Sequence, residues 1–242
     1  MHESARRPAA STGQVWRDVV VLLLIPGVIA LVLAVTAAPN ALVAVVVIAA
    51  AMLAPTVAGV SLLRRRPLRV TTADRVTLFR VALTGVLAAT AVLIHAGALD
   101  PRSWILAVVI GLALVLDAVD GAVARYTRSS STAGARLDME ADAAALLIVS
   151  VIAAATVGWW AAGIGLMRYL FVAAGWVRPA LRGEMNYSFF RRSVAATQAV
   201  ALFLALLPVV PAMISAVILA IALILLIASF GRDALTLERM ES

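Results

Sequence analysis

Eight apolar runs dominate this sequence and limit what it can fold into. A helix needs roughly 20 residues to cross the hydrocarbon core of a bilayer, and the 242-residue chain is 64% hydrophobic with a mean hydropathy of +1.04. This composition lies outside the range of soluble domains and predicts an all-α integral membrane protein with eight spans. We expect these spans at residues 18–38, 41–63, 74–97, 102–124, 138–159, 161–181, 194–209 and 211–230.

The basic residues predict how the chain is oriented. All twenty are arginine, the formal charge is +7, and most of them gather before the first run, in every second connection and after the last run. Cytoplasmic connections carry an excess of arginine and lysine, so we expect both termini and the arginine-rich connections on the cytoplasmic side of the cell membrane. Arginines between apolar runs fit topology and anionic lipid headgroups better than nucleic acid, which we do not expect as a partner.

The stretch RRRPLR, with Pro67 inside it, is the one linker-like break. We interpret it as the border between a two-helix membrane unit at residues 1–70 and a six-helix body at residues 71–242. The first run could instead be a signal peptide, because an arginine pair precedes it and small residues follow. Its apolar core is longer than the 7 to 15 residues typical of a signal, which favours a retained helix.

Half of the chain's eight aspartates lie between residues 117 and 142. Asp117 and Asp120 are three residues apart, and Asp138 and Asp142 are four apart, so each pair shares one helix face. The segment between them can turn the chain so that the pairs face each other. A charge in a membrane helix costs about 2.5–3.5 kcal/mol, so this cluster needs cations. Carboxylates suit Mg²⁺ or Mn²⁺, and two such ions can clamp a phosphate during transfer.

These residues match the pattern D-x2-D-G-x2-A-R-x8-G-x3-D-x3-D at every specified position. In this the sequence resembles the CDP-alcohol phosphotransferase (CDP-alcohol phosphatidyltransferase) family, from about residue 72 onward. The resemblance implies that a hydroxyl attacks the β-phosphorus of a CDP-linked lipid, usually CDP-diacylglycerol, and that CMP leaves. It implies metal ligation by Asp117, Asp120 and Asp138, while Asp142 would complete the metal site and act as the general base.

The same resemblance implies a nucleotide site. Gly121, Ala124 and Arg125 would line the CMP pocket, and Gly134 would allow close approach. Upstream, ADRVTLFR is similar to the family's N-x-x-T-x-x-R, with Asp74 where asparagine is common, and makes Thr77 and Arg80 further nucleotide-side candidates. Members of the family are commonly homodimers, which the resemblance implies for this chain as well.

Arginines in the second half are candidates for binding a phosphorylated acceptor. An arginine inside an apolar run is a functional hypothesis, and the alternatives for Arg168 are snorkelling or pairing with a buried aspartate. The surrounding stretch resembles part of the phosphatidylglycerophosphate synthases, so glycerol 3-phosphate is the preferred acceptor, and inositol phosphate or another alcohol stays open. Glu140 lies off the metal face, so we expect it to be solvated or paired with an arginine. The acceptor-binding candidates are Arg168, Arg178, Arg182 and Arg192.

Two other classes of function compete with this enzyme. Acids inside membrane helices can carry ions in a coupled transporter, and a non-catalytic scaffold would not need the metal site. A transporter would more naturally place its acids near the midplane on repeat-related helices. Here they cluster at one membrane face, no inverted repeat is visible and all four aspartates are intact, which favours the enzyme.

Overall fold

The computed structural model describes residues 12–64, 72–127, 132–177 and 189–241. Within the helices it leaves out chiefly the side chains of residues 118–127, 132–136, 189–195 and 233–241. The described chain is all-helical, as predicted, and each expected span corresponds to one α-helix. The elements are α1 (Thr12–Ala37), α2 (Ala41–Leu63), α3 (Thr72–His95), α4 (Trp104–Thr127), α5 (Thr132–Val157), the 3₁₀ turn η1 (Trp159–Ala161), α6 (Ala162–Val177), α7 (Phe189–Ala205) and α8 (Ala212–Glu241).

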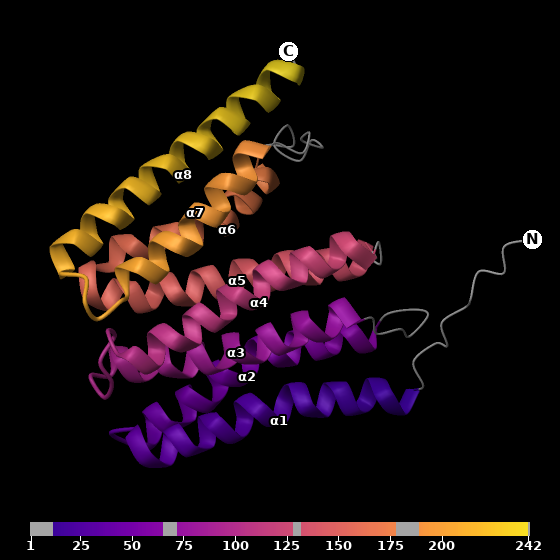
Figure 1. The fold of residues 1–242 in the computed structure, drawn as a ribbon, viewed down its shortest axis with the longest axis vertical. Helices are drawn as coiled ribbons and strands as arrows, with labels where there is room; N and C mark the ends of the chain where they lie inside the picture. The colour runs from indigo at the N-terminus through magenta and orange to yellow at the C-terminus, as the bar shows by residue number, and fades with distance from the viewer. Residues whose placement is uncertain (1–11, 65–71, 128–131, 178–188, 242) are drawn as a thin grey trace, which may run out of the picture.

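The helices run up and down through one elongated bundle (Figure 1). The odd-numbered helices begin, and the even-numbered helices end, at the same end of this bundle. The sequence places its arginine-rich connections there. The predicted alternation therefore means that the arginine-rich connections lie at one end of the fold and the other connections lie at the opposite end.

Local signals explain where several helices begin and end. The Asn40 side chain accepts a hydrogen bond from the Val43 backbone N–H at 3.0 Å, and thereby caps the first turn of α2. Gly97, after α3, has φ of 72°, and Gly158, after α5, has φ of 105°. These backbone conformations are accessible mainly to glycine, so the two residues mark the turns at which the chain reverses.

The end opposite the arginine-rich connections is held by polar and aromatic contacts. Arg102 Nη2 donates to the carbonyl oxygen of Leu207 at 3.2 Å, which ties the α3–α4 connection to the end of α7. The His95 ring stacks on Trp159 with 4.8 Å between centroids, and its Nε2 lies 2.9 Å from the Val151 carbonyl oxygen. These contacts therefore bring the ends of α3, α5 and α7 together at this side of the bundle.

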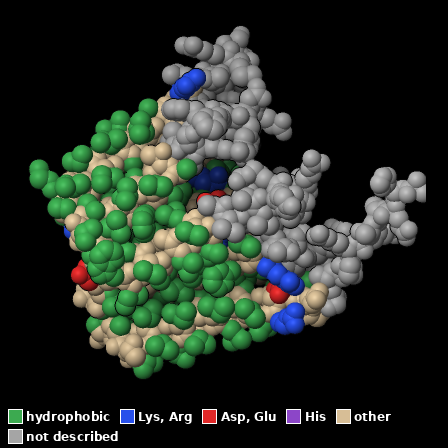
Figure 2. Space-filling model, in the orientation of Figure 1, with side chains coloured by type: hydrophobic (Ala, Val, Ile, Leu, Met, Phe, Trp, Pro, Cys, Tyr) green, Lys and Arg blue, Asp and Glu red, His purple; other side chains and the backbone are tan. Residues whose placement is uncertain are grey.

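Five of the described helices are long and apolar enough to cross a membrane: Gly13–Ala37, Ala41–Leu63, Asp74–His95, Leu137–Val157 and Ala212–Arg232. Three shorter apolar stretches accompany them: Trp104–Asp117, Trp159–Ala174 and Ala196–Ala205. Figure 2 shows a face covered mostly by hydrophobic side chains, with charged groups at few positions. Such a surface is suited to lipid, and the chain is a multi-pass membrane protein.

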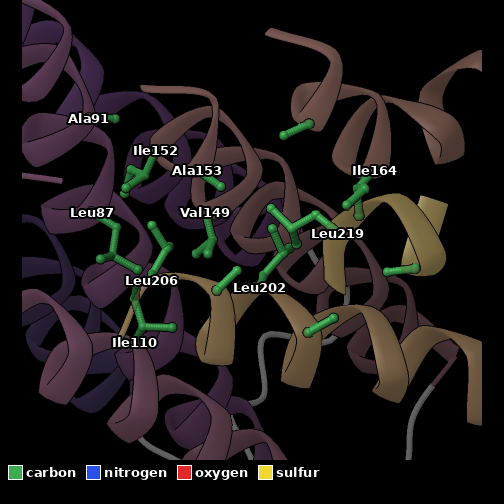
Figure 3. Packing of buried hydrophobic residues seen from close by; sticks show 14 of the residues in the cluster. Leu87, Ala91, Ile110, Val149, Ile152, Ala153, Ile164, Leu202, Leu206 and Leu219 are labelled. Atoms are coloured by element: carbon green, nitrogen blue, oxygen red, sulfur yellow. The ribbon is translucent and has the colours of Figure 1, made fainter. Parts of the chain in front are cut away.

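The largest apolar core joins α3 to α8. Leu87 from α3, Ile110 from α4, Val149 from α5 and Leu202 from α7 belong to one buried cluster (Figure 3). Leu219 extends this cluster to α8, where it is fully buried. Burial of a leucine-sized side chain contributes about 1.5–3 kcal/mol relative to an aqueous reference, so this cluster fixes α4, α5 and α7 around α3.

The first two helices pack against the opposite side of α3. One cluster joins Val19 of α1 and Leu62 of α2 to Val81 of α3 and Ala141 of α5. A Cβ atom added at Gly85 of α3 would collide with the backbone oxygen of Ala51 and would lie 3.1 Å from Pro55 and 3.2 Å from Pro26. This position admits only glycine because the three helices approach so closely there. The packing of α1 and α2 therefore holds the helix that carries Arg80.

Candidate active site

Three of the four signature aspartates have described side chains, and α4 and α5 bring them together. Asp117 lies in α4, and Asp138 and Asp142 lie one turn apart in α5. The two helices come from either side of the connection at residues 128–131, and their aspartates lie near the arginine-rich end of the bundle. These three carboxylates converge, as the sequence pattern predicts for pairs that face each other.

The side chain at their centre is Arg80 of α3. Its Nη1 donates to Asp138 Oδ1 at 2.9 Å, and its Nη2 lies 2.8 Å from Asp117 Oδ1. Nη2 also donates to Asp142 Oδ1. One guanidinium thus joins three carboxylates from two other helices. Its planar donors suit this geometry, because they can address several carboxylate oxygens at fixed angles.

Burial and charge distinguish Arg80 from its partners. Its side chain is 8% exposed, whereas those of Asp117, Asp138 and Asp142 are 50%, 40% and 39% exposed. Among the side chains that the structure describes, one guanidinium faces three carboxylates, so these described groups together carry an excess of negative charge beside apolar helices. Such an excess is costly in a medium of low dielectric constant and favours the binding of further cations.

A cavity of about 310 Å³ extends from these charges between α3, α4, α5 and α7. Arg80, Asp117 and Asp142 line its polar end, and Thr84 follows Arg80 one turn along α3. The remaining wall is apolar or made of small side chains: Leu87, Ile110, Ala113, Leu114, Ala141, Ala145, Leu146, Val149, Ala196, Ala199 and Leu202. The cavity therefore offers a charged head and an apolar body, as an amphiphilic ligand requires.

A model of the CDP-alcohol phosphatidyltransferase family matches residues 70–228. The chain belongs to this family. No curated protein and no solved structure matched the chain. The match covers α3 to α7 and most of α8, confirms the resemblance carried by the aspartate pattern, and makes the protein a membrane enzyme of the transferase class. It decides against the transporter and the scaffold.

The donor set around Arg80 fits the divalent cations expected for a CDP-alcohol phosphatidyltransferase. Carboxylate oxygens are the hard ligands that Mg²⁺ and Mn²⁺ prefer, and the described groups carry excess negative charge. Among the side chains that the structure describes, no three acids or histidines form a ready metal cage, because Asp117, Asp138 and Asp142 are arranged around the guanidinium. The fourth aspartate, Asp120, has no described side chain.

Several positions that the family pattern singles out lie outside the described side chains. For the nucleotide site they are Gly121, Ala124, Arg125 and Gly134, and for the acceptor site they are Arg178, Arg182 and Arg192. Thr77 and Asp74 are described and buried, at 4% and 5% exposure, and both make polar interactions within the protein. Of the upstream nucleotide-side candidates, Arg80 lines the cavity.

Arg168 lies apart from the three described aspartates, in α6. Its Nη2 donates to Glu140 Oε1 of α5 at 2.7 Å, and the two side chains are 37% and 63% exposed. The prediction that Glu140 is solvated or paired with an arginine is confirmed. Arg168 is paired, but with this glutamate rather than with a buried aspartate. The contact links α5 to α6 two residues from both Asp138 and Asp142.

Sequence reasoning underestimated Arg80 and missed Thr84. The spacing of Arg80, Thr84 and Leu87, at zero, four and seven residues, places them on one face of α3 and was the available signal. The alanines of α5 and α7 that leave room for the cavity also follow helical spacing, at Ala141 and Ala145 and at Ala196 and Ala199. In an alanine-rich chain that spacing is too common to identify a cavity.

Proposed function

We propose that this enzyme moves a phosphatidyl group from a CDP-linked lipid, such as CDP-diacylglycerol, to the hydroxyl of a polar acceptor in phospholipid biosynthesis. A bond forms between the acceptor oxygen and the β-phosphorus, the bond from that phosphorus to CMP breaks, and CMP leaves with the bridging oxygen. The observation that carries this proposal is the convergence of carboxylates and a guanidinium at the head of a largely apolar cavity.

In this proposal Asp117, Asp120, Asp138 and Asp142 hold Mg²⁺ or Mn²⁺ as a pair of ions. When bound, such ions neutralise the diphosphate and make its phosphorus more electrophilic. Asp142 also accepts the proton of the acceptor hydroxyl as the new bond forms. Its place at the cavity wall supports this role, because a hydroxyl in the cavity can reach the carboxylate directly.

Arg80 belongs to the nucleotide side of the proposed site. Its guanidinium can donate hydrogen bonds to diphosphate oxygens from its position at the polar end of the cavity. The family pattern assigns four further residues to the nucleotide site: Thr77, Gly121, Ala124 and Arg125. It assigns Gly134 to the point at which the ligand approaches the backbone closely. The apolar wall beyond Arg80 supports a lipid-linked rather than a soluble nucleotide as the donor.

The preferred acceptor is glycerol 3-phosphate, with inositol phosphate or another alcohol as alternatives. An acceptor phosphate would need cationic partners, and Arg168, Arg178, Arg182 and Arg192 are the candidates on α6, on α7 and between them. Arg168 pairs with Glu140, which lies off the metal face of α5, so its assignment is supported by the sequence resemblance. It would contact an acceptor through donors that its bond to Glu140 leaves available.

The proposed orientation has the aspartates, the arginine-rich connections and both termini on the cytoplasmic side. The bias of arginine toward one end of the bundle supports this orientation. The proposed organisation is a two-helix unit at residues 1–70 followed by a six-helix catalytic domain at residues 71–242. The start of the family match at residue 70 supports that border.

The test is release of CMP from CDP-diacylglycerol by the purified enzyme with Mg²⁺ or Mn²⁺, across a panel of acceptors. The panel should contain glycerol 3-phosphate, inositol phosphate, a polyol and serine. We expect CMP release that depends on one acceptor, and a loss of at least about 100-fold in kcat for Asp142→Asn, since general-base catalysis contributes typically 10²–10⁴-fold. Full activity of that variant would refute the role of Asp142 as the base.

The acceptor role of Arg168 can be separated from its structural contact with Glu140. Arg168→Ala removes both the cation and the ion pair, whereas Glu140→Gln removes only the charge of the partner. If Arg168 binds the acceptor phosphate, Arg168→Ala raises the KM for the acceptor and Glu140→Gln does not. An equal effect of the two substitutions would assign Arg168 to helix packing.

A further inference from the structure

A second groove lies between α1 and α3, away from the aspartates. Its volume is about 220 Å³. Its polar end is formed by Arg17, Asp18 and Arg75, near the starts of the two helices. The rest of the groove is lined by apolar side chains of both helices: Val21, Leu22, Ile25, Leu78, Phe79 and Ala82. Because seven residues of helix rise about 10 Å, the apolar part extends roughly that far from the charged end.

The charges at the polar end are unevenly exposed. Arg75 Nε lies 3.0 Å from Asp18 Oδ2, and the side chains are 46% and 15% exposed. Arg17, the third charged residue of the groove, is exposed. The acidic group is thus largely covered, whereas both basic groups reach the surface. In Figure 2, basic and acidic side chains lie together near the start of α1. The accessible end of the groove is therefore cationic.

The apolar part of the groove faces lipid. Val21 is 47% exposed and Phe79 is 42% exposed, and α1 and α3 both qualify as membrane spans. Arginines at the ends of spans lie at the level of the lipid headgroups, where they attract anionic lipids. The groove thus combines cations at headgroup depth with an apolar channel that leads toward the membrane interior.

We propose that this groove binds an anionic phospholipid, with its phosphate against Arg17 and Arg75 and one acyl chain along the apolar walls. A free phosphate would satisfy the arginines but leave the apolar part of the groove without a ligand. A zwitterionic lipid would fill the apolar part but gain less from the cationic end. The anionic phospholipid is the one occupant that matches both ends.

This site is separate from the proposed catalytic cavity. At 100° per residue, Arg75, Phe79 and Ala82 lie on one side of α3, and Arg80 and Thr84 lie on roughly the opposite side. A lipid in the groove therefore packs against the back of the helix that presents Arg80 to the aspartates.

Native mass spectrometry of the detergent-solubilised enzyme tests the proposal, with titrations of phosphatidylglycerol and phosphatidylcholine in EDTA. The chelator and the absence of a CDP-linked lipid make the result independent of catalysis. We expect phosphatidylglycerol to bind more tightly. Arg17→Ala should weaken its binding about fivefold, the usual contribution of one arginine near an anionic headgroup. Arg64→Ala is the matched control, because Arg64 is also exposed at this end but does not line the groove, and it should change binding less than twofold.

Val21→Trp tests the apolar part, because a larger side chain at this exposed position fills the groove without disturbing the core. It should weaken binding of both lipids, and inorganic phosphate should not compete. Equal binding of the two lipids, or equal losses in Arg17→Ala and Arg64→Ala, would overturn the proposal. Unchanged binding in Val21→Trp, or displacement of the lipid by inorganic phosphate, would also overturn it. The melting temperatures of the variants should stay close to that of the wild type, which excludes unfolding as the cause.

Discussion

Replacing Arg80 by alanine removes the cation that, among the described side chains, lies between three carboxylates. The partner side chains are 39–50% exposed, so their ion pairs lie between the buried and the surface extremes. Breaking a buried pair costs about 3–5 kcal/mol, and an exposed pair contributes at most about 1 kcal/mol. For the whole group we expect a loss of about 2–3 kcal/mol in the free energy of unfolding.

In a chain of this length, 1 kcal/mol corresponds to a shift of about 2–4 °C in melting temperature. Arg80→Ala should therefore unfold about 4–12 °C below the wild type when divalent cations are removed with EDTA. Added Mg²⁺ or Mn²⁺ should recover much of this loss, because the exposed carboxylates then gain a substitute cation. The same ions should stabilise the wild type less, since Arg80 already occupies the centre of the group.

The assay is thermal unfolding of both proteins in detergent, with and without the ion. Arg75→Ala is the matched control: the same substitution on the same helix, where the arginine makes one ion pair at 46% exposure. It should lower the melting temperature by no more than about 4 °C, irrespective of Mg²⁺. An Arg80→Ala protein that is as stable as the wild type in EDTA, or that ignores the added ion, would refute the argument from charge compensation.

Three further predictions concern packing, a buried hydroxyl and the metal site. Gly85→Ala should lose about 1–3 kcal/mol of stability, because its Cβ meets the Ala51 backbone. Gly231→Ala, where nothing lies within 4 Å of the added Cβ, should be neutral or slightly stabilising in the same melting assay. Ser215→Ala should cost about 0.5–1.5 kcal/mol, since the fully buried hydroxyl donates to the Ala205 carbonyl oxygen at 2.7 Å; an unchanged melting temperature would contradict this value. Chelation of divalent cations should abolish CMP release, and Mg²⁺ or Mn²⁺ should restore it; activity that persists in EDTA would remove the metal ions from the proposed mechanism.

The helices were predictable because the apolar runs are long and are separated by connections that contain arginine, proline or glycine. The run expected at residues 41–63 matches α2 (Ala41–Leu63) in full. The run at residues 194–209 differs more from α7, which begins at Phe189, because the first turns of α7 carry Arg191 and Arg192 and do not look apolar. Hydropathy reports the part of a helix that suits lipid, and it misses polar turns that extend beyond it.

The site was predictable within one stretch of sequence and less so across the fold. Spacing alone grouped Asp117, Asp138 and Asp142, because they flank a single connection. The central position of Arg80 depends on how α3 packs between α2 and α5, and it lies 58 residues before Asp138. No local pattern encodes a contact over that separation. The pairing of Arg168 with Glu140 depends in the same way on the crossing of α5 and α6.

The pairing of α1 with α2 limits how many membrane spans such an enzyme can carry in front of its catalytic domain. The two spans cross the membrane in opposite directions, so α3 begins on the same side of the membrane whether or not they are present. A single added span would instead place the aspartates on the opposite side of the bilayer. Accessory spans in front of this catalytic body are therefore expected to come in even numbers.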